Sequence, residues 1–226
     1  ADIGWVDLSS AVSGMLSKLP IKAIATVQQK NATSMIVLAS SSINKAGDLK
    51  GKRIGSTPGG SDSTVLGPFL TANAIGKDDV TVVNLPGNGK LASLMAGQVD
   101  AISGQSWYYQ AAVEEAGKPA RAVLYADYGL NLLDHGFIAS TAYMGSQKAT
   151  ITRFLRAYKK GLEYTIANQD KSCALVVKKA GAGLTQELCK AQLKGWIALL
   201  ASDESAKKPW GWNNPDQWNK TLSFLK

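Results

Sequence analysis

The stretch 48–107 constrains the fold of this chain more than any other part of it. It reads DLKGKRIGSTPGGSDSTVLGPFL and runs, through a second turn and helix, to GQVDAISGQSW. A short strand at 52–55 precedes a polar loop at 56–61, and apolar residues then recur with helical spacing from Asp62 onward. A loop that leads into a helix N-terminus carries free backbone N–H groups. We therefore expect a ligand site at this loop.

In the sequence around this loop, patterns typical of strands alternate with patterns typical of helices. We expect strands at 80–85, 99–103 and 121–125, and helices at 62–74, 89–96 and 106–116. Such alternation implies a mainly parallel sheet, and ligands of open α/β sheets bind beyond the carboxyl ends of the strands. No Lys-Ser/Thr pair closes the loop at 56–61, which excludes a phosphate loop of the GxxxxGK[ST] kind.

Two sets of elements flank this α/β region. On its N-terminal side we expect a strand end at 1–4, a loop at 5–7, a helix at 8–19 capped by Asp7, and strands at 21–27 and 35–39. On its C-terminal side we expect a strand at 136–140 and helices at 150–167, 171–179, 186–200 and 216–225. We interpret 1–43 and 136–226 as one discontinuous lobe, with 44–135 inserted as a second lobe.

The chain resembles a known family through DLKGKRIG, the helix after it, and the Gly-x-Val-Asp-Ala pattern at 97–101. It is similar to the periplasmic solute-binding proteins of ABC transporters, in particular the nitrate, sulfonate, taurine and thiamine-pyrimidine group, over its whole length. The resemblance implies a two-lobed α/β periplasmic-binding-protein fold of type 2, with a ligand in an interlobe cleft. Family members have a strand, a helix and a strand before the point matching Ala1, so we expect the opening of the first lobe to be missing from this sequence.

The resemblance also implies a function. A protein of this group is periplasmic, or extracellular and membrane-associated, and it captures a small organic ligand and delivers it to a membrane permease. We expect a monomer that needs no cofactor. No run of eighteen apolar residues and no signal peptide occur in the sequence.

The candidate ligand-binding residues lie at the expected strand ends. Tryptophans at such ends offer apolar faces to a flat ligand, and the loop at 56–61 offers hydroxyl and N–H donors. The candidates are Trp5, Asp7, Thr57, Gly59, Gly60, Ser61, Asn88, Gln105, Ser106, Trp107 and His135. Core packing remains open for both tryptophans, and a hinge or core role for His135. We expect Asp62 to cap its own helix.

The two cysteines, Cys173 and Cys189, flank an expected turn at 181–183. Helices joined by a tight turn can bring such residues within bridging distance. The export implied by the resemblance favours a Cys173–Cys189 disulfide over two buried free thiols.

The net charge of +8 suits an anionic ligand, an acidic partner or nucleic acid, but the basic residues are scattered without interleaved aromatics, so we expect no nucleic-acid binding. A lone histidine excludes a multi-histidine metal site.

The fold family contains enzymes, pyrimidine synthases and a desulfinase with a cysteine nucleophile, and such an enzyme is the alternative. Both cysteines here lie away from the strand-end loops, so we expect no catalysis. Two candidate tryptophans suit a flat aromatic or pyrimidine ligand. A sulfonate could use the donors of the loop at 56–61, but no arginine lies in the strand-end loops, and the nearest in sequence is Arg53.

Overall fold

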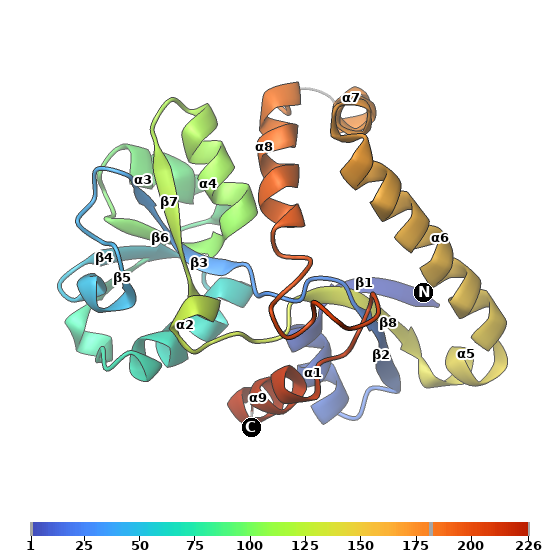
Figure 1. Ribbon diagram of the computed structural model, residues 1–226. Helices are drawn as coiled ribbons and strands as arrows, with labels where there is room; N and C mark the ends of the chain where they lie inside the picture. Colours follow the sequence, from blue (N-terminus) through green and yellow to red (C-terminus); the bar gives the residue numbers. More distant parts are fainter. Residues whose placement is uncertain (1, 181–182, 226) are drawn as a thin grey trace. The chain divides into compact units, whose positions relative to one another are not determined.

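The computed structural model describes residues 2–180 and 183–225, and the chain forms two compact units (Figure 1). Unit 1 comprises Ala1–Asn31, Leu132–Lys179 and Ile197–Lys226, and unit 2 comprises Ala32–Asn131 and Ala180–Trp196. The expected lobes had their boundaries at residues 43 and 135 and held the whole C-terminal region in the first lobe. No helix among the described residues is long and apolar enough to cross a bilayer.

Unit 2 is built on a five-stranded sheet with the order β5-β4-β6-β3-β7. The strands are β3 (Thr33–Leu38), β4 (Arg53–Ser56), β5 (Thr81–Asn84), β6 (Ala101–Gln105) and β7 (Ala120–Leu124). β4 runs parallel to β5 and β6, whereas β3 is antiparallel to both β6 and β7. Because β6 and β7 are both antiparallel to β3, the strands β4, β5, β6 and β7 all run in one direction, which confirms the expectation of a mainly parallel sheet. The exception is β3, which we did not expect in this sheet.

The placement of β3 also moves a boundary. We assigned the run 35–39 to the first lobe, but β3 lies inside the unit 2 sheet and pairs on both edges. Five of its six residues are buried. Burial on both faces explains why its sequence, TSMIVL, shows no alternation that would have marked it as part of this sheet.

The α-helices of unit 2 are α2 (Ser61–Ala72), α3 (Lys90–Met95), α4 (Ser106–Glu115) and most of α8 (Gln186–Ile197). The core cluster consists of Ile36, Leu94, Val99, Ile102 and Val113. Short 3₁₀ turns lie at Ala46–Leu49 (η1), Lys77–Asp79 (η2), Gly87–Gly89 (η3) and Tyr125–Tyr128 (η4). The assignment of 186–200 to the first lobe differs from this structure, in which 180–196 belongs to unit 2.

Unit 1 contains a three-stranded antiparallel sheet with the order β1-β8-β2. The strands are β1 (Ile3–Asp7), β2 (Ile21–Thr26) and β8 (His135–Ser140). The expected loop at 5–7 is wrong, because the residues of β1 pair with β8 as far as Asp7, which lies opposite His135. This register places Trp5 opposite Phe137.

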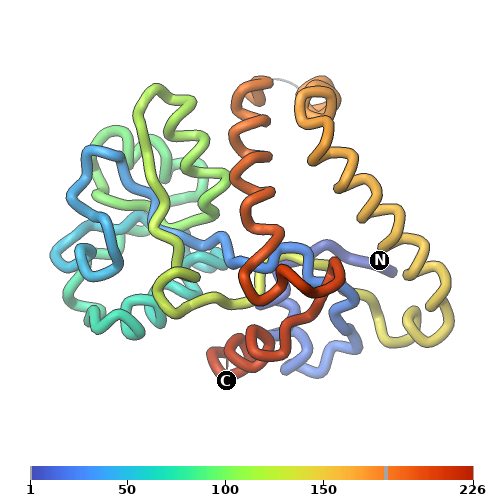
Figure 2. Tube along the Cα trace, in the orientation of Figure 1, coloured from blue at the N-terminus to red at the C-terminus, as the bar shows by residue number. Residues whose placement is uncertain are grey.

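The helices of unit 1 are α1 (Leu8–Leu16), α5 (Thr141–Ser146), α6 (Lys148–Ala167), α7 (Gln169–Ala180) and α9 (Pro215–Leu225). Asp7 caps α1 by accepting a hydrogen bond from the backbone N–H of Ser10 at 3.0 Å, which confirms the expected cap. α1 and α9 pack side by side, with Leu8, Val12 and Leu222 in their shared core cluster (Figure 2). Of the expected turn at 181–183, residues 181 and 182 lie outside the described residues.

Candidate functional site

The strand-end loops of unit 2 lie close together. β4 and β6 are parallel neighbours, so the loop after Ser56 and the start of α4 lie at one edge of the sheet. A methyl group built on Gly87 would lie 3.9 Å from both the Thr57 Oγ1 and the Tyr109 hydroxyl. The Tyr109 hydroxyl donates to the Gly87 carbonyl at 3.1 Å. The loop after β4, the turn at Gly87 and the first turn of α4 therefore lie close together.

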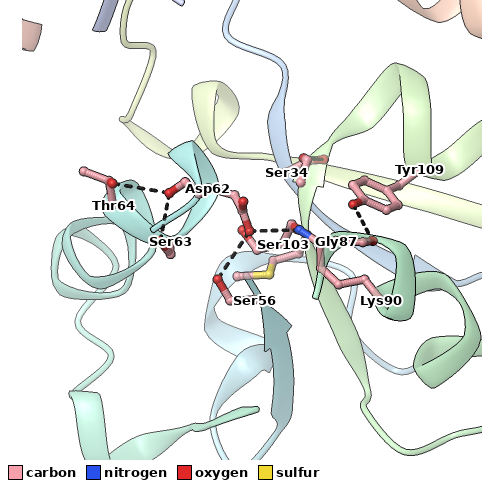
Figure 3. A network of polar contacts seen from close by, with 12 residues as sticks. Ser34, Ser56, Asp62, Ser63, Thr64, Gly87, Lys90, Ser103 and Tyr109 are labelled. Atoms are coloured by element: carbon pink, nitrogen blue, oxygen red, sulfur yellow. Dashed lines mark hydrogen bonds and ion pairs between the residues drawn. The ribbon is translucent and has the colours of Figure 1, made fainter. Parts of the chain in front are cut away.

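A buried ion pair lies beneath these loops (Figure 3). Lys90 Nζ donates to Asp62 Oδ2 at 3.1 Å and to the Ser103 carbonyl at 2.7 Å, and Lys90 is only 2% exposed. The same carboxylate oxygen accepts from Ser56 Oγ at 3.3 Å. Lys90 Nζ also lies 4.9 Å from the centre of the Tyr109 ring, where a cation is attracted to the aromatic face.

This pair corrects one expectation and adds a residue that sequence reasoning missed. Asp62 does not cap α2: the N-cap position is Gly60, and no side chain caps the helix. In the sequence, Lys90 follows a Pro-Gly-Asn-Gly turn at 86–89 and lies in the helix expected at 89–96, with nothing that marks it as a site residue. No local spacing connects two residues that are 28 positions apart, so the sequence held no signal for the pair.

A second polar layer supports the ion pair. The Ser103 and Tyr125 hydroxyls lie 3.0 Å apart, and Ser34 Oγ donates to the Gly104 carbonyl at 3.0 Å. Burial, followed by the charge of Asp62, raises the pKa of Tyr109 to about 12. Burial likewise raises the pKa of Tyr125. Both phenols are therefore neutral donors over the physiological pH range.

Three of the predicted ligand residues carry buried polar atoms that have no hydrogen-bond partner among the described residues. They are Thr57 Oγ1, Gln105 Oε1 and Trp107 Nε1. A buried polar atom without a partner costs about 1–3 kcal/mol. Such atoms at the carboxyl ends of β4 and β6 are the positions at which a ligand would supply the missing partners.

The strand before Trp107 is longer than expected. We expected it to end at Ser103, but β6 continues through Gly104 to Gln105 because Gly104 pairs with Ser34 of β3. Gly104 also admits the Tyr109 ring, since an added methyl group would lie 2.5 Å from that ring. Trp107 is the second residue of α4, as expected, and its backbone packs against Gly195 of α8.

The other unit 2 candidates lie on the same loops with more solvent exposure. Gly59, with φ of +73°, and Ser61 are exposed, as is Asn88 in η3. Ser106 is buried, and its backbone N–H donates to the Ala32 carbonyl at 2.8 Å.

Unit 1 brings together its three predicted residues, Trp5, Asp7 and His135. The Trp5 ring is stacked on His135 with centroids 5.7 Å apart, and Trp5 remains 41% exposed. The ring centroid of Tyr158, in α6, lies 6.0 Å from that of Trp5 and 5.8 Å from that of Trp210. Sequence reasoning missed Tyr158 and Trp210, because Tyr158 reads as one member of an amphipathic helix face and Trp210 as part of a loop.

Two carboxylates surround the imidazole. Asp134 is fully buried and lies 2.5 Å from His135 Nδ1 through its Oδ1. Burial lowers the pKa of His135, but the hydrogen bond and charge of Asp134 and the charge of Asp7 together raise it by more, so the net shift is upward. Burial, and then the charge of Asp134, raises the pKa of Asp7. His135 is thus held in one orientation beside an exposed indole.

Neither cysteine is a free thiol in the structure: Cys173 and Cys189 are both buried and both disulfide-bonded. Over residues 2–180 and 183–225, no three His, Cys, Asp or Glu side chains group as metal ligands.

Comparison with known proteins gives consistent matches. The chain is 25% identical over 229 residues to the riboflavin-binding protein RibY of Chloroflexus aurantiacus, covering 96% of this chain and 63% of that protein. It is 24% identical over 212 residues to the formylaminopyrimidine-binding protein of Halalkalibacterium halodurans, covering 92% of this chain and 63% of that protein. The chain thus spans less than two thirds of the length of these relatives.

The periplasmic aliphatic sulphonate binding protein SsuA from Escherichia coli superposes with a TM-score of 0.74 at 20% identity, over 86% of this chain and 66% of that one. This likeness shows that the chain has the α/β fold of periplasmic binding proteins. The family described as NMT1/THI5 like matches residues 1–172. The chain therefore belongs to the NMT1/THI5-like family.

Proposed function

We propose that this protein is the extracytoplasmic substrate-binding component of an ABC importer, which captures a small organic nutrient and delivers it to a membrane permease. Family membership and fold support this class of function. The observation that carries it is the set of unpartnered buried polar atoms on Thr57, Gln105 and Trp107. These atoms occupy the edge of the sheet at which α/β proteins bind ligands.

The aromatic residues favour a flat organic ligand. Trp5 in unit 1 presents an exposed indole, and Trp107 in unit 2 presents a buried indole N–H without a partner. The arginine nearest in sequence to the loop at 56–61, Arg53, is committed to an ion pair with Asp100 at 2.9 Å. The names of two relatives, a riboflavin-binding and a formylaminopyrimidine-binding protein, are consistent with a heteroaromatic ligand. A sulfonate is the other candidate.

One observation favours an enzyme as the second candidate. His135 and Asp134 form a histidine–carboxylate pair beside the exposed Trp5. A nucleophile is the missing part, since both cysteines are disulfide-bonded. We propose that the protein performs no catalysis, and mass spectrometry of ligand recovered after incubation tests this: an unchanged ligand is expected, and a converted one would favour the enzyme.

A thermal-shift screen over heteroaromatic compounds, alkanesulfonates and inorganic anions tests the binding function. A ligand at one hundred times its dissociation constant adds about 2.7 kcal/mol, which raises the melting temperature by roughly 5–11 °C in a chain of this size. We expect heteroaromatic compounds to give such shifts. Shifts with inorganic anions alone would contradict the aromatic site.

The Trp107→Ala variant tests the site itself. Loss of the indole should weaken binding about 10–100-fold while the melting temperature without ligand changes little. If Trp107 is a core residue instead, the same change lowers stability by about 3–5 kcal/mol. Tyr164→Ala, which removes an exposed aromatic of α6, is the matched control and should leave affinity unchanged.

A further inference from the structure

The two carboxylate oxygens of Asp62 have different surroundings. Oδ2 accepts from Lys90 Nζ and from Ser56 Oγ. Oδ1 receives no hydrogen bond from any residue in the described ranges, although Asp62 is only 8% exposed. The carboxylate therefore keeps one oxygen unpaired, and because Oδ1 is not among the fully buried atoms without partners, this oxygen keeps some exposure.

The unpaired oxygen faces the loop that the sequence marked as a ligand site. A methyl group built on Gly60 would lie 2.8 Å from Asp62 Oδ1 and 3.5 Å from Thr57 Cβ. Thr57 also carries the buried, unpartnered Oγ1. An unpaired carboxylate oxygen and a hydroxyl without a partner thus belong to residues that both lie close to Gly60, where no room remains for a side chain.

Chemistry limits which ligand groups can pair with Asp62 Oδ1. Lys90 and Ser56 satisfy only Oδ2. A ligand that displaces solvent from Oδ1 must offer it a donor, because a carboxylate oxygen that loses its hydrogen bonds is costly. A ring N–H or an amino group supplies one, whereas the oxygens of a sulfonate only accept and would be repelled by the carboxylate.

We propose that Asp62 Oδ1 accepts a hydrogen bond from an N–H group of a heteroaromatic ligand and thereby selects N–H-bearing rings over sulfonates. Lys90 and Ser56 hold the carboxylate in place through Oδ2, and Thr57 Oγ1 supplies the adjacent polar contact. This assignment rests on the proposed binding function and narrows its ligand class.

Matched pairs of probes test the proposal by calorimetry on the full chain. The pairs are riboflavin with 3-methylriboflavin, and 4-aminopyrimidine with 4-(dimethylamino)pyrimidine, in which methyl groups replace the N–H hydrogens. In at least one pair the N–H probe should bind about 10–100-fold more tightly than its methylated partner, as expected for a charge-assisted hydrogen bond.

The variant Asp62→Asn should abolish that ratio. Lys90 and Ser56 both donate to the side-chain oxygen, so the amide of the variant turns its NH₂ group toward the ligand, where it meets another donor. Ser63→Ala is the matched control in the same helical turn, because its hydroxyl already donates to the Gly60 carbonyl at 2.8 Å. This control should keep the ratio of the wild type.

The possible outcomes separate this proposal from the binding function. Equal binding of both members of each pair, or a ratio retained in Asp62→Asn, overturns the role of Asp62 and leaves the binding function standing. Binding of alkanesulfonates but of no N–H probe does the same. If neither heterocycles nor alkanesulfonates bind, the proposed function itself fails. The wild-type ratio decides the matter even if Asp62→Asn does not fold.

Discussion

Replacing Lys90 by Met should destabilise unit 2 severely. Lys90 is 2% exposed and donates two hydrogen bonds, one to Asp62 and one to the Ser103 carbonyl. Methionine has a similar length and no charge, so the substitution removes the partner and leaves the space filled. The Asp62 carboxylate is then buried with only the Ser56 hydroxyl as a donor.

The magnitude follows from that unpaired charge. Removing one member of a buried ion pair costs about 3–5 kcal/mol, because the remaining charge has lost its compensation. For a chain of this length, each kilocalorie lowers the melting temperature by roughly 2–4 °C, so a decrease of about 6–20 °C is expected. Circular dichroism during heating, together with urea unfolding, measures both quantities.

The double variant Lys90→Met/Asp62→Asn is the internal control. It removes the unpaired charge and should recover about 1–3 kcal/mol of the loss, although the Ser103 carbonyl remains without its donor. A loss below about 1 kcal/mol in the single variant, or a double variant no more stable than Lys90→Met, would refute the role given to this pair.

Three further outcomes are expected. Trp5→Ala should weaken ligand binding about 10-fold with little change in melting temperature, since the indole is 41% exposed; calorimetry and a melt decide. Folding raises the pKa of His135 above the unfolded value of 6.5, so the protonated imidazole contributes its full stabilisation below about pH 6.5 and loses it as pH rises through the folded pKa. Urea unfolding across this range should show the free energy of unfolding decreasing with pH in the wild type, and this decrease should be absent in His135→Gln. Non-reducing peptide mapping should recover Cys173 and Cys189 in one linked peptide, and reduction should lower stability by roughly 3 kcal/mol; free thiols in protein folded under oxidising conditions would contradict the pairing.

Most elements of unit 2 could be predicted because local signals mark them. The Ser/Gly/Pro loop, the Pro-Gly-Asn-Gly turn and the helical spacing after each strand place β4, β5, α2, α3 and α4 within a residue or two of the expected bounds. Strand direction was not predictable for β3, since its apolar run carries no sign of which strands it joins. β6 extends two residues beyond its expected end, because Gly104 continues the strand and does not break it. Glycine stands at this position because any side chain would collide with the Tyr109 ring.

The site was predictable where it depended on strand ends and not where it depended on long-range pairing. Thr57, Gln105 and Trp107 could be proposed as ligand residues because each lies at or just after the carboxyl end of a strand. Trp5 and His135 lie side by side because β1 pairs with β8, and no local sequence pattern predicts this long-range pairing. Asp62 was assigned to a helix cap because that role needs only neighbouring residues, whereas its real partner, Lys90, is brought near by the fold.

The order of strands in the two sheets also sets an order of folding. In unit 1, β8 lies between β1 and β2, and among the described residues it is the strand with which each of them pairs, so this pairing forms only after residues 135–140 have been made. The unit 2 sheet needs nothing beyond β7, which ends at Leu124. During synthesis the unit 2 sheet can therefore form first. The pairing of β1 and β2 with β8 forms later, because it joins residues that are far apart in the sequence. Those two strands are the part of the chain most exposed to mispairing before the protein is complete.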